Sequence, residues 1–424
     1  MNSRFLFFLY YYPPLPGTPA KRNFRIASEV SKRTSYTKIF TATAQPEGQK
    51  SDPNVQIETL PTYDYRAYLR KKTEDGALPE KVKNHWWVQM GIKLINTFPF
   101  NLIIGEGGLI YYKNLLRKGR KEIEEQKITH LYSSYRPFAD HYAAYKLKKQ
   151  FPHLIWIADF RDLIIDPHYN HIFFKSGHHL FFKRVFRKAN YLTTVSDGLA
   201  RQLERYNSDV ITLRNGIKNV PDQIEPTHCK YFKIAYTGSM FLDKRNAEPL
   251  FAAIRELINQ HLMSEDYVRI IYAGKDSDIW QKLASKFELD AILVDKGIVS
   301  DKEATLIQRE ACINVLLTIS SDKLEGVLTG KMIEYFESGS PVLGIVVGRN
   351  DSELSNILKE LEIGKSFSDQ DIDHSAIKDF IYKEYQYYKT TGMNRKPVNI
   401  DVLKSKYSSE AVMRNFLEKI HLNK

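Results

Sequence analysis

A glycine–serine turn followed by two cations stands out in the second half of the chain. Gly238 and Ser239 follow an apolar run typical of a buried strand, and Lys244 and Arg245 come shortly afterwards, before a helical segment. A lysine supplies a point charge and an arginine a planar fork of donors, so together they could bind the oxygens of a diphosphate. The alternative is an ordinary solvated pair at a helix start.

A second phosphate-type pattern opens a later helix. Thr329, Gly330 and Lys331 stand at its expected N-terminus, where backbone N–H groups and the helix dipole favour an anion. Glu334 follows one turn later, where a carboxylate can accept hydrogen bonds from two ribose hydroxyls. The pattern is not a P-loop, because Glu325 replaces its first glycine and no magnesium-binding Ser or Thr follows the lysine. The alternative is a strand-to-helix turn with Lys331 and Glu334 in solvent.

A proline-rich loop at residues 12–22 follows the first apolar run and enters a helix. Gly17 would let the backbone approach an anion closely at the helix start. No G-x-G-x-x-G occurs in this loop, so the sequence does not favour a dehydrogenase. The alternative is an ordinary turn between a strand and a helix.

Four charged or titratable residues follow two expected strands of the first half. Asp159, Arg161 and Asp162 end one strand, and His141 comes soon after the strand before it. Because parallel strands end at the same edge of a sheet, these side chains could converge on a ligand. The equal alternative is that buried Asp–Arg pairs hold the fold together.

Metal-binding patterns are weak. Asp369 and Asp371 have the Asp-x-Asp spacing of some sugar transferases, but they precede a helical segment and are more typical of a helix cap. The only cysteines, Cys229 and Cys312, lack metal-ligand spacing and are expected in the core of a protein from a reducing compartment.

The elements that position these residues alternate between short apolar runs and helical-length segments. In the first half the expected strands are 4–10, 38–44, 128–133, 154–159, 191–195 and 210–213. In the second half they are 232–236, 268–273, 292–294, 313–317 and 341–346. Continuous apolar strands separated by helices indicate parallel sheets covered on both faces. The predicted fold class is α/β, with two Rossmann-like doubly wound domains facing across a cleft.

The predicted domains divide the 424 residues after residue 218. Residues 1–218 form the N-terminal domain, with an irregular insertion at 62–126. Residues 219–398 form the C-terminal domain, and 399–424 form a terminal helix that returns to the first domain. The stretch 5–12 is short and runs into two prolines, so we expect a buried strand there and not a signal peptide.

Charge is distributed unevenly between the halves. Residues 1–218 contain 35 Lys and Arg against 19 Asp and Glu, whereas the remainder contains 27 against 31. A basic half indicates an anionic partner such as a lipid phosphate, a membrane surface or nucleic acid; the alternative is a solvated basic surface. No apolar run reaches the length of a membrane span. The apolar and basic run 180–188 could touch a membrane, but an amphipathic helix packed on the sheet is the better explanation.

Taken in order, these segments resemble the family 4 glycosyltransferases of the GT-B fold, especially those of bacterial surface-polysaccharide assembly. The matching stretches are 11–14 (YYPP) with 21–23 (KRN), 158–162 (ADFRD), 194–199 (TVSDGL), 214–217 (RNGI), 236–239 (YTGS), and 329–335 (TGKMIEY) with 339–342 (GSPV). The sequence departs from the family at Ser239, where an arginine is usual, and at Gly326, where the first of two glutamates is usual.

The resemblance implies a retaining hexosyltransferase that needs no metal or other cofactor. It implies that Lys244 contacts the donor diphosphate, that Glu334 holds the ribose, and that the loop at Gly17 closes over the donor. Asp162 and Arg161 would face the reacting sugar or the acceptor and, with Lys244, form the expected catalytic set.

The donor-binding set is expected to comprise Gly17, Gly238, Ser239, Lys244, Arg245, Thr329, Gly330, Lys331 and Glu334. His141 and Asp159 are expected on the acceptor side.

The expected reaction moves a sugar from a nucleotide diphosphate sugar to a glycan or polyprenyl-linked acceptor, in cell-surface polysaccharide biosynthesis. The expected location is the cytoplasm, including the periphery of the inner membrane face. Two alternatives remain: a sugar-nucleotide epimerase of the same fold, and a degenerate homologue that only binds. Nucleic acid is not favoured, because no known binding module is present.

Overall fold

The computed structural model divides the chain into two compact units. Unit 1 comprises Met1–Arg214 with Met413–Lys424, and unit 2 comprises Asn215–Val412. The structure describes residues 3–15, 17–45, 55–62, 85–166, 171–217, 220, 223–240, 245–322, 325–326, 330–370, 375–398 and 400–422. The boundary after Arg214 lies close to the expected one after residue 218, and the last residues group with unit 1.

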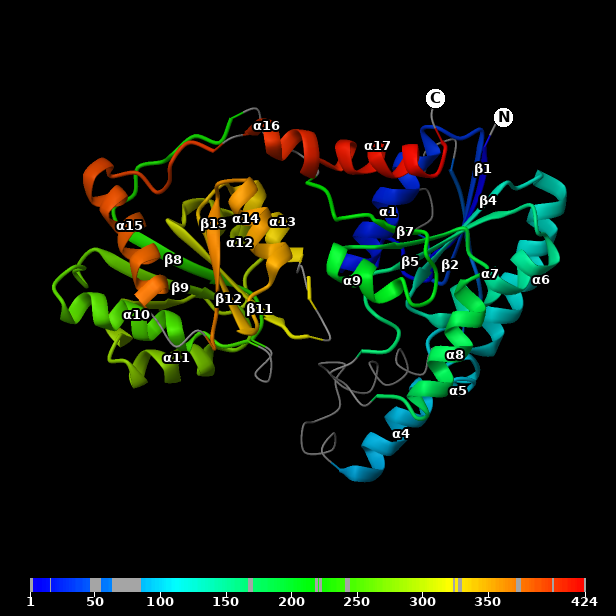
Figure 1. The fold of residues 1–424 in the computed structure, drawn as a ribbon, viewed down its shortest axis with the longest axis horizontal. Coiled ribbons are helices and arrows are strands. Elements are labelled where there is room, and N and C mark those ends of the chain that lie inside the picture. Colours follow the sequence, from blue (N-terminus) through cyan, green and yellow to red (C-terminus); the bar gives the residue numbers. More distant parts are fainter. Residues whose placement is uncertain are drawn as a thin grey trace. The chain divides into compact units, whose positions relative to one another are not determined.

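Unit 1 is built on a seven-stranded parallel sheet in the order β3-β2-β1-β4-β5-β6-β7 (Figure 1). Its strands are β1 (Arg4–Phe8), β2 (Tyr36–Thr41), β3 (Val55–Thr59), β4 (His130–Tyr135), β5 (Ile155–Phe160), β6 (Tyr191–Thr194) and β7 (Val210–Thr212). In register, Phe7 of β1 pairs with Ile39 of β2 and Tyr132 of β4. This arrangement confirms the predicted α/β class for the first half.

Helices cover both faces of this sheet. The helices of unit 1 are α1 (Thr18–Ser31), α4 (Trp86–Asn96), α5 (Phe100–Ile103), α6 (Gly108–Gln126), α7 (Phe138–Gln150), α8 (Lys175–Phe186) and α9 (Asp197–Leu203), of which α4 buries no residue. Leu6 and Phe8 of β1 belong to one core with residues of α6, α7 and α8, and Phe5 and Phe7 are buried on the opposite face. Because β1 is covered on both sides, its apolar run is continuous rather than alternating.

The segment expected to be an irregular insertion contains regular helices in its described part. The longest is α6, with 19 residues, which packs against α7 and β1. The run 180–188 also packs as expected: α8 buries Phe182, Val185 and Phe186 in the core and leaves Leu180 exposed.

A buried ion pair joins α1 to the centre of the sheet. Arg22 donates two hydrogen bonds to the carboxylate of Asp159 on β5, from Nη2 at 2.8 Å and from Nε at 3.2 Å. It also donates from Nη1 to the carbonyl oxygen of Leu213 at 2.9 Å. Both charged side chains are buried. The pair therefore ties the helix that follows β1 to β5, the strand that ends directly before Arg161 and Asp162.

Unit 2 contains a six-stranded parallel sheet in the order β10-β9-β8-β11-β12-β13. Its strands are β8 (Phe232–Thr237), β9 (Val268–Ala273), β10 (Leu293–Asp295), β11 (Ile313–Ser320), β12 (Val342–Gly348) and β13 (Gly364–Ser368). Its helices are α10 (Glu248–Asn259), α11 (Ser277–Lys286), η1 (Asp290–Ile292), α12 (Asp301–Glu310), α13 (Gly330–Ser338), α14 (Ser352–Glu360), α15 (Ser375–Thr391), α16 (Ile400–Val402) and η2 (Leu403–Tyr407). The chain then ends in α17 (Ser409–Lys419).

Two large hydrophobic cores and one smaller cluster pack on the second sheet. One large core contains Phe232 and Tyr236 of β8 with residues of α10, α11 and α15, and the other contains Leu316 of β11 with residues of α13 and α14. Cys312 is buried and Cys229 is half-buried, both as free thiols. The second doubly wound domain is thus confirmed. Within the described parts of the chain, no helix combines the length and apolarity needed to cross a membrane.

We expect Arg22→Met to lower the free energy of unfolding of unit 1 by about 3–5 kcal/mol, because it leaves a buried carboxylate without its counter-charge. Urea denaturation followed by circular dichroism measures this change. Lys32→Met is the control, because it removes an exposed pair with Glu29 just beyond the end of the same helix. Equal effects of the two substitutions would contradict a structural role for the buried pair.

Candidate functional site

The carboxyl edge of the first sheet contains a cavity of about 470 Å³. β1 lies between β2 and β4, so the connections leaving β1 and β4 diverge at this edge, which is where ligands bind in doubly wound sheets. The cavity is lined by Tyr11, Leu15, Pro19, Ala20, Glu106, Arg136, Arg161 and Asp162. Its volume falls within the range of about 300–1,000 Å³ of small-molecule sites.

Charges of both signs face this cavity. Arg161 donates to the adjacent Asp162 with an N–O distance of 2.7 Å, and the Asp162 side chain is 59% exposed. The pKa of Arg136 is raised, mainly by its interaction with Tyr135. Burial lowers this pKa, and the carboxylates of Glu106 and Asp162 raise it further. Guanidinium groups beside carboxylates can bind hydroxyl-rich or anionic ligands. The cavity therefore suits a polar ligand such as a sugar.

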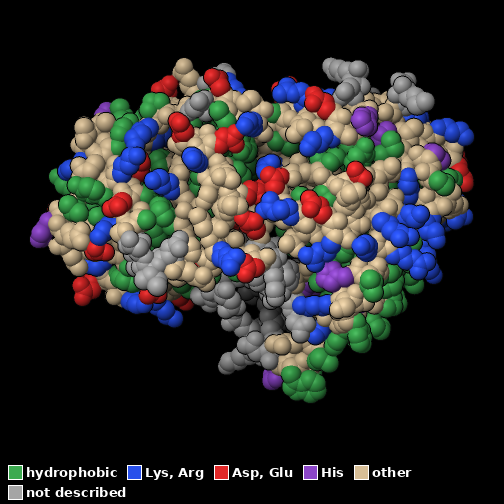
Figure 2. Space-filling model, in the orientation of Figure 1, with side chains coloured by type: hydrophobic (Ala, Val, Ile, Leu, Met, Phe, Trp, Pro, Cys, Tyr) green, Lys and Arg blue, Asp and Glu red, His purple; other side chains and the backbone are tan. Residues whose placement is uncertain are grey.

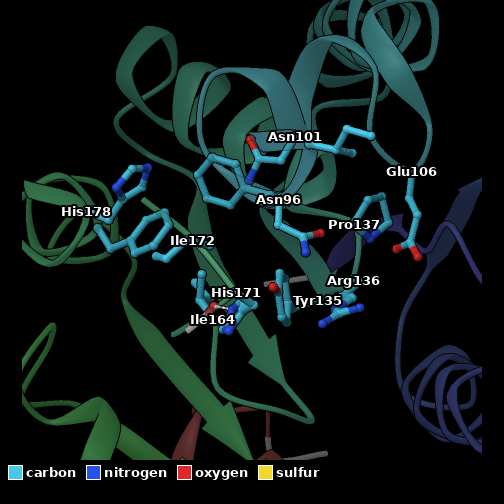
Figure 3. A pocket seen from close by; sticks show the side chains of 14 residues that line it. Asn96, Asn101, Glu106, Tyr135, Arg136, Pro137, Ile164, His171, Ile172 and His178 are labelled. Atoms are coloured by element: carbon cyan, nitrogen blue, oxygen red, sulfur yellow. Dashed lines mark hydrogen bonds between the residues drawn. The ribbon is translucent and has the colours of Figure 1, made fainter. Parts of the chain in front are cut away.

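A smaller cavity of about 50 Å³ shares Glu106 and Arg136 with the larger one (Figure 3). Asn96, Tyr135 and His171 also line it, and His171 Nε2 lies 3.2 Å from the carbonyl oxygen of Ile164. It has room for a few water molecules among polar groups that could bind them.

Gly17 lies at the N-cap of α1, close to residues that line the larger cavity. Its φ of 114° is in the region that favours glycine. A Cβ there would meet only Pro19 Cδ, at 3.6 Å, so the conformation rather than crowding calls for glycine. Pro19 and Ala20, in the first turn of α1, line the larger cavity.

His141 and Asp159, predicted on the acceptor side, are both completely buried. His141 Nδ1 lies 2.7 Å from Ser133 Oγ, and burial lowers the pKa of this histidine to about 3. Burial alone would raise the pKa of Asp159, but Arg22 and a hydrogen bond from Thr193 lower it overall. Neither side chain lines the two cavities described above, so in this structure both support the strand ends from the core.

A buried carboxyl group holds the end of β1. Asp140, in the first turn of α7, accepts a hydrogen bond from the backbone N–H of Tyr10 at 3.0 Å. Burial raises the pKa of Asp140 to about 8, against the smaller opposing effect of that hydrogen bond. This contact fixes the point at which the chain leaves β1 for the cavity-lining loop.

In unit 2, two residues that were predicted to bind phosphate, Gly238 and Lys331, lie together at the carboxyl edge of the second sheet. β8 lies between β9 and β11, and Gly238 follows β8 while Lys331 lies in the first turn of α13, which follows β11. An ideal Cβ on Gly238 would lie 2.2 Å from Lys331 Cε, so the lysine side chain packs directly on the glycine. The two motifs are therefore in contact at this edge of the sheet.

Arg245 is tied into the glycine–serine turn. Its Nη1 donates to the Tyr236 hydroxyl at 3.0 Å and to the carbonyl oxygen of Ser239, which also accepts from Tyr236 at 2.9 Å. The guanidinium therefore shapes the turn after β8 and lies near Lys331, whose pKa it helps to lower.

Glu334 is 54% exposed on α13, with Oε2 3.9 Å from Lys331 Nζ. Gln308 donates from Nε2 to this carboxylate at 3.2 Å and to Thr237 Oγ1 at 2.8 Å. Burial lowers the pKa of Lys331, and Glu334 partly opposes that change. The arrangement offers a partly buried ammonium and an accessible carboxylate on adjacent turns of one helix.

Two predicted residues, Lys244 and Thr329, lie outside the described residues, and Gly330 begins α13. Asp369 accepts a hydrogen bond from the backbone N–H of Gly348 at 2.8 Å, while Asp371 also lies outside the described part.

Sequence reasoning missed Glu106, Arg136 and Gln308. Arg136 could have been found because it directly follows β4. The other two carry no local signal, since only packing brings them to the sites.

Comparison with known proteins identifies the fold. No model of a known protein family matches the chain, and no curated protein matches its sequence. Among solved structures, a glycosyltransferase from Rickettsia africae ESF-5 matches with a TM-score of 0.61 and 11% identity, over 100% of this chain and 99% of that chain. Sucrose-phosphate synthase from Thermosynechococcus elongatus matches with a TM-score of 0.58 and 11% identity, over 99% and 98%. The lipopolysaccharide outer core galactosyltransferase WaaB matches with 0.57 and 10%, over 99% of both chains.

At such low identities the likeness shows the fold alone. The two parallel-sheet units correspond to the two domains of these GT-B proteins along essentially their whole length. The predicted fold class, with two doubly wound α/β domains, is therefore confirmed.

The raised pKa of Asp140 predicts a specific pH dependence of stability. The folded chain retains a proton that the unfolded chain releases between an ordinary aspartate pKa of about 4 and the folded value of about 8. Stability from this group therefore falls as the pH rises through that window, by up to about 1.4 kcal/mol per pH unit. Because asparagine mimics the protonated carboxyl, the stability difference between Asp140→Asn and wild type should grow in the variant's favour from about pH 5 to about pH 8.

Denaturant unfolding at several pH values measures this difference. Asp278→Asn, in the exposed first turn of α11, controls for loss of a carboxylate at a helix start. A difference between Asp140→Asn and wild type that is constant with pH would contradict the protonated state.

Proposed function

We propose that the chain is a glycosyltransferase that takes a sugar from a nucleotide diphosphate sugar bound mainly by unit 2. The observation that supports this proposal most directly is the contact between Gly238 and Lys331 at the edge between β8 and β11. A bare backbone turn, an ammonium group and a helix N-terminus together suit a diphosphate. Glu334, exposed on the next turn of α13, suits the ribose hydroxyls.

The proposed mechanism rests on charge. Cleavage of the bond from the sugar to the diphosphate develops negative charge on the departing phosphate and positive charge on the sugar ring. Lys331, Arg245 and the N-terminus of α13 can stabilise the phosphate without a metal ion. We also assign Lys244 and Thr329 to the diphosphate. In the retaining reaction that we propose, the departing phosphate takes the acceptor proton, so no separate base is required.

The cavity of unit 1 is proposed as the acceptor side. Arg161 and Asp162 line it and are proposed to contact the acceptor or the reacting sugar. Arg136 and Glu106 are added to this set because they line the same cavity. The proposed acceptor is a glycan or polyprenyl-linked sugar, and the proposed role is surface-polysaccharide assembly in the cytoplasm, as in family 4 enzymes.

The first test measures thermal stabilisation by UDP, GDP, ADP and their sugar conjugates without added metal. A ligand at about 100 times its dissociation constant should stabilise the chain by about 2.7 kcal/mol. We expect one nucleotide diphosphate to raise the melting midpoint of wild type and Glu334→Ala to lose most of that shift. Glu310→Ala is the matched control, because Glu310 is similarly exposed but pairs with Lys233 at the amino end of β8.

If no nucleotide stabilises the wild type, the donor site is wrong and a degenerate homologue becomes the better account. If a nucleotide sugar binds and is epimerised without transfer, the proposed reaction is wrong while the donor site stands.

The contact between Gly238 and Lys331 gives a sharper test of the donor site. We expect Gly238→Ala to weaken nucleotide binding at least tenfold, because the new methyl group displaces the lysine side chain and strains a backbone with φ of 138°. Gly297→Ala controls for backbone strain, since its φ is 59° and a Cβ there meets nothing within 4 Å. Isothermal titration with the stabilising nucleotide measures both. Equal affinities of the two variants would refute a role for this contact.

A further inference from the structure

Helix α4 of unit 1 has an unusual exposure pattern. None of its 11 residues is buried, although most of them are apolar. Trp86 is 75% exposed and Trp87 is 59% exposed. An amphipathic helix of a soluble protein normally turns such residues toward the core. The apolar side chains of α4 are therefore directed at something other than this chain's own core.

Neighbouring elements extend the same surface. The Thr97 hydroxyl, just after α4, accepts from the backbone N–H of Phe173 at 2.9 Å, and Phe98 stacks on Phe181 of α8 with ring centroids 4.4 Å apart. These contacts place the start of α8 beside α4 and α5. Phe174, directly before α8, is 82% exposed, and Leu180 of α8 is 72% exposed.

We call the exposed apolar residues of these elements, together with Ile110 of α6, the apolar face. They are Trp86, Trp87, Met90, Ile92, Leu94, Phe100, Ile103, Ile104, Ile110, Phe174 and Leu180. Figure 2 shows hydrophobic side chains gathered over α4, α5 and α8, with Lys and Arg side chains beside them over α6 and α7. A patch that combines so many large apolar residues marks an interaction site.

Cations border the apolar face. Lys113 and Arg117 are exposed on α6, and Lys183, Arg184 and Arg187 are exposed on or directly after α8. No acidic residue occurs between Trp86 and Ile104. Tryptophan rings favour the boundary between lipid headgroups and acyl chains, and lysine and arginine favour anionic headgroups.

We propose that the apolar face docks unit 1 on an anionic lipid bilayer, with α4 lying in the plane of the interface. Apolar insertion and a basic border together provide the two signals that stable peripheral binding requires. A second copy of the chain fits less well, because a symmetric pair would bring two cationic borders together. The docking requires neither donor nor acceptor, so it can be tested apart from the proposed transfer.

The four tryptophans make the test direct. Trp156 and Trp280 are completely buried, whereas Trp86 and Trp87 are exposed, so a change in tryptophan emission on binding reports α4. Mixing the full chain with phosphatidylcholine vesicles that contain phosphatidylglycerol should shift the emission to shorter wavelength. Vesicles whose lipids have brominated acyl chains should quench the emission of Trp86 and Trp87. Pure phosphatidylcholine should bind at least tenfold more weakly.

Two sets of substitutions separate the apolar and electrostatic contributions. Trp86→Ser with Trp87→Ser should abolish the spectral change and reduce cosedimentation at least tenfold. Lys183→Gln, Arg184→Gln and Arg187→Gln together should weaken binding by about fivefold per lost charge. Ile298→Ser is the matched control, because Ile298 is 83% exposed in unit 2, and it should bind as wild type. Circular dichroism checks that each variant is folded.

Three results would overturn the proposal. The first is no binding to anionic vesicles at low salt, and the second is binding that the tryptophan substitutions leave unchanged. The third is a vesicle-free dimer, measured by light scattering, that the tryptophan substitutions convert to monomer. That result would assign the apolar face to a second copy of the chain.

Discussion

The position of the first strand in each sheet is the constraint on which both candidate sites depend. β1 lies between β2 and β4, and β8 lies between β9 and β11. Because all strands are parallel, the connections after β1 and β4 leave the first sheet at the same edge and turn to opposite faces. The connections after β8 and β11 do the same in the second sheet. The space left between them contains the large cavity of unit 1 and the contact between Gly238 and Lys331 in unit 2.

Buried polar groups hold the ends of these strands. In unit 1, Asp159 receives two hydrogen bonds from Arg22, and Asp140 receives one from the backbone of Tyr10. In unit 2, Gln308 joins the last residue of β8 to Glu334 on α13. Burying such groups is costly unless each finds a partner, so they select one arrangement of the loops. Charged residues near a site can thus position its loops from the core, without contacting a ligand.

Part of the excess of Lys and Arg in the first half of the chain lies on one surface of unit 1. Several of its cations are exposed on α6 and around α8, next to large apolar side chains. Unit 1 therefore combines a polar cavity with an external apolar and basic surface. Different residues form the two features, since the cavity is lined by the loop after β1, the start of α1, Glu106 and residues after β4 and β5, whereas the apolar face belongs mainly to α4, α5 and α8.

Much of the fold was predictable from the chain alone. Continuous apolar runs such as 4–10 and 232–236 correspond to central strands, because a strand covered on both faces needs apolar side chains on both. The sequence also indicated that Gly238 and Lys331 each follow an apolar strand, but their contact comes from the structure.

Only the tertiary structure decided which polar residues face a cavity and which lie in the core. Asp159 and Asp162 belong to one short motif, yet the first is completely buried against Arg22 and the second has a side chain that is 59% exposed. Glu106, Arg136 and Gln308 reach the sites through contacts with segments remote in the chain. Apolarity along a strand is a local property that a sequence displays. The burial of one charged side chain depends on every element packed around it, and those neighbours are chosen only when the chain folds.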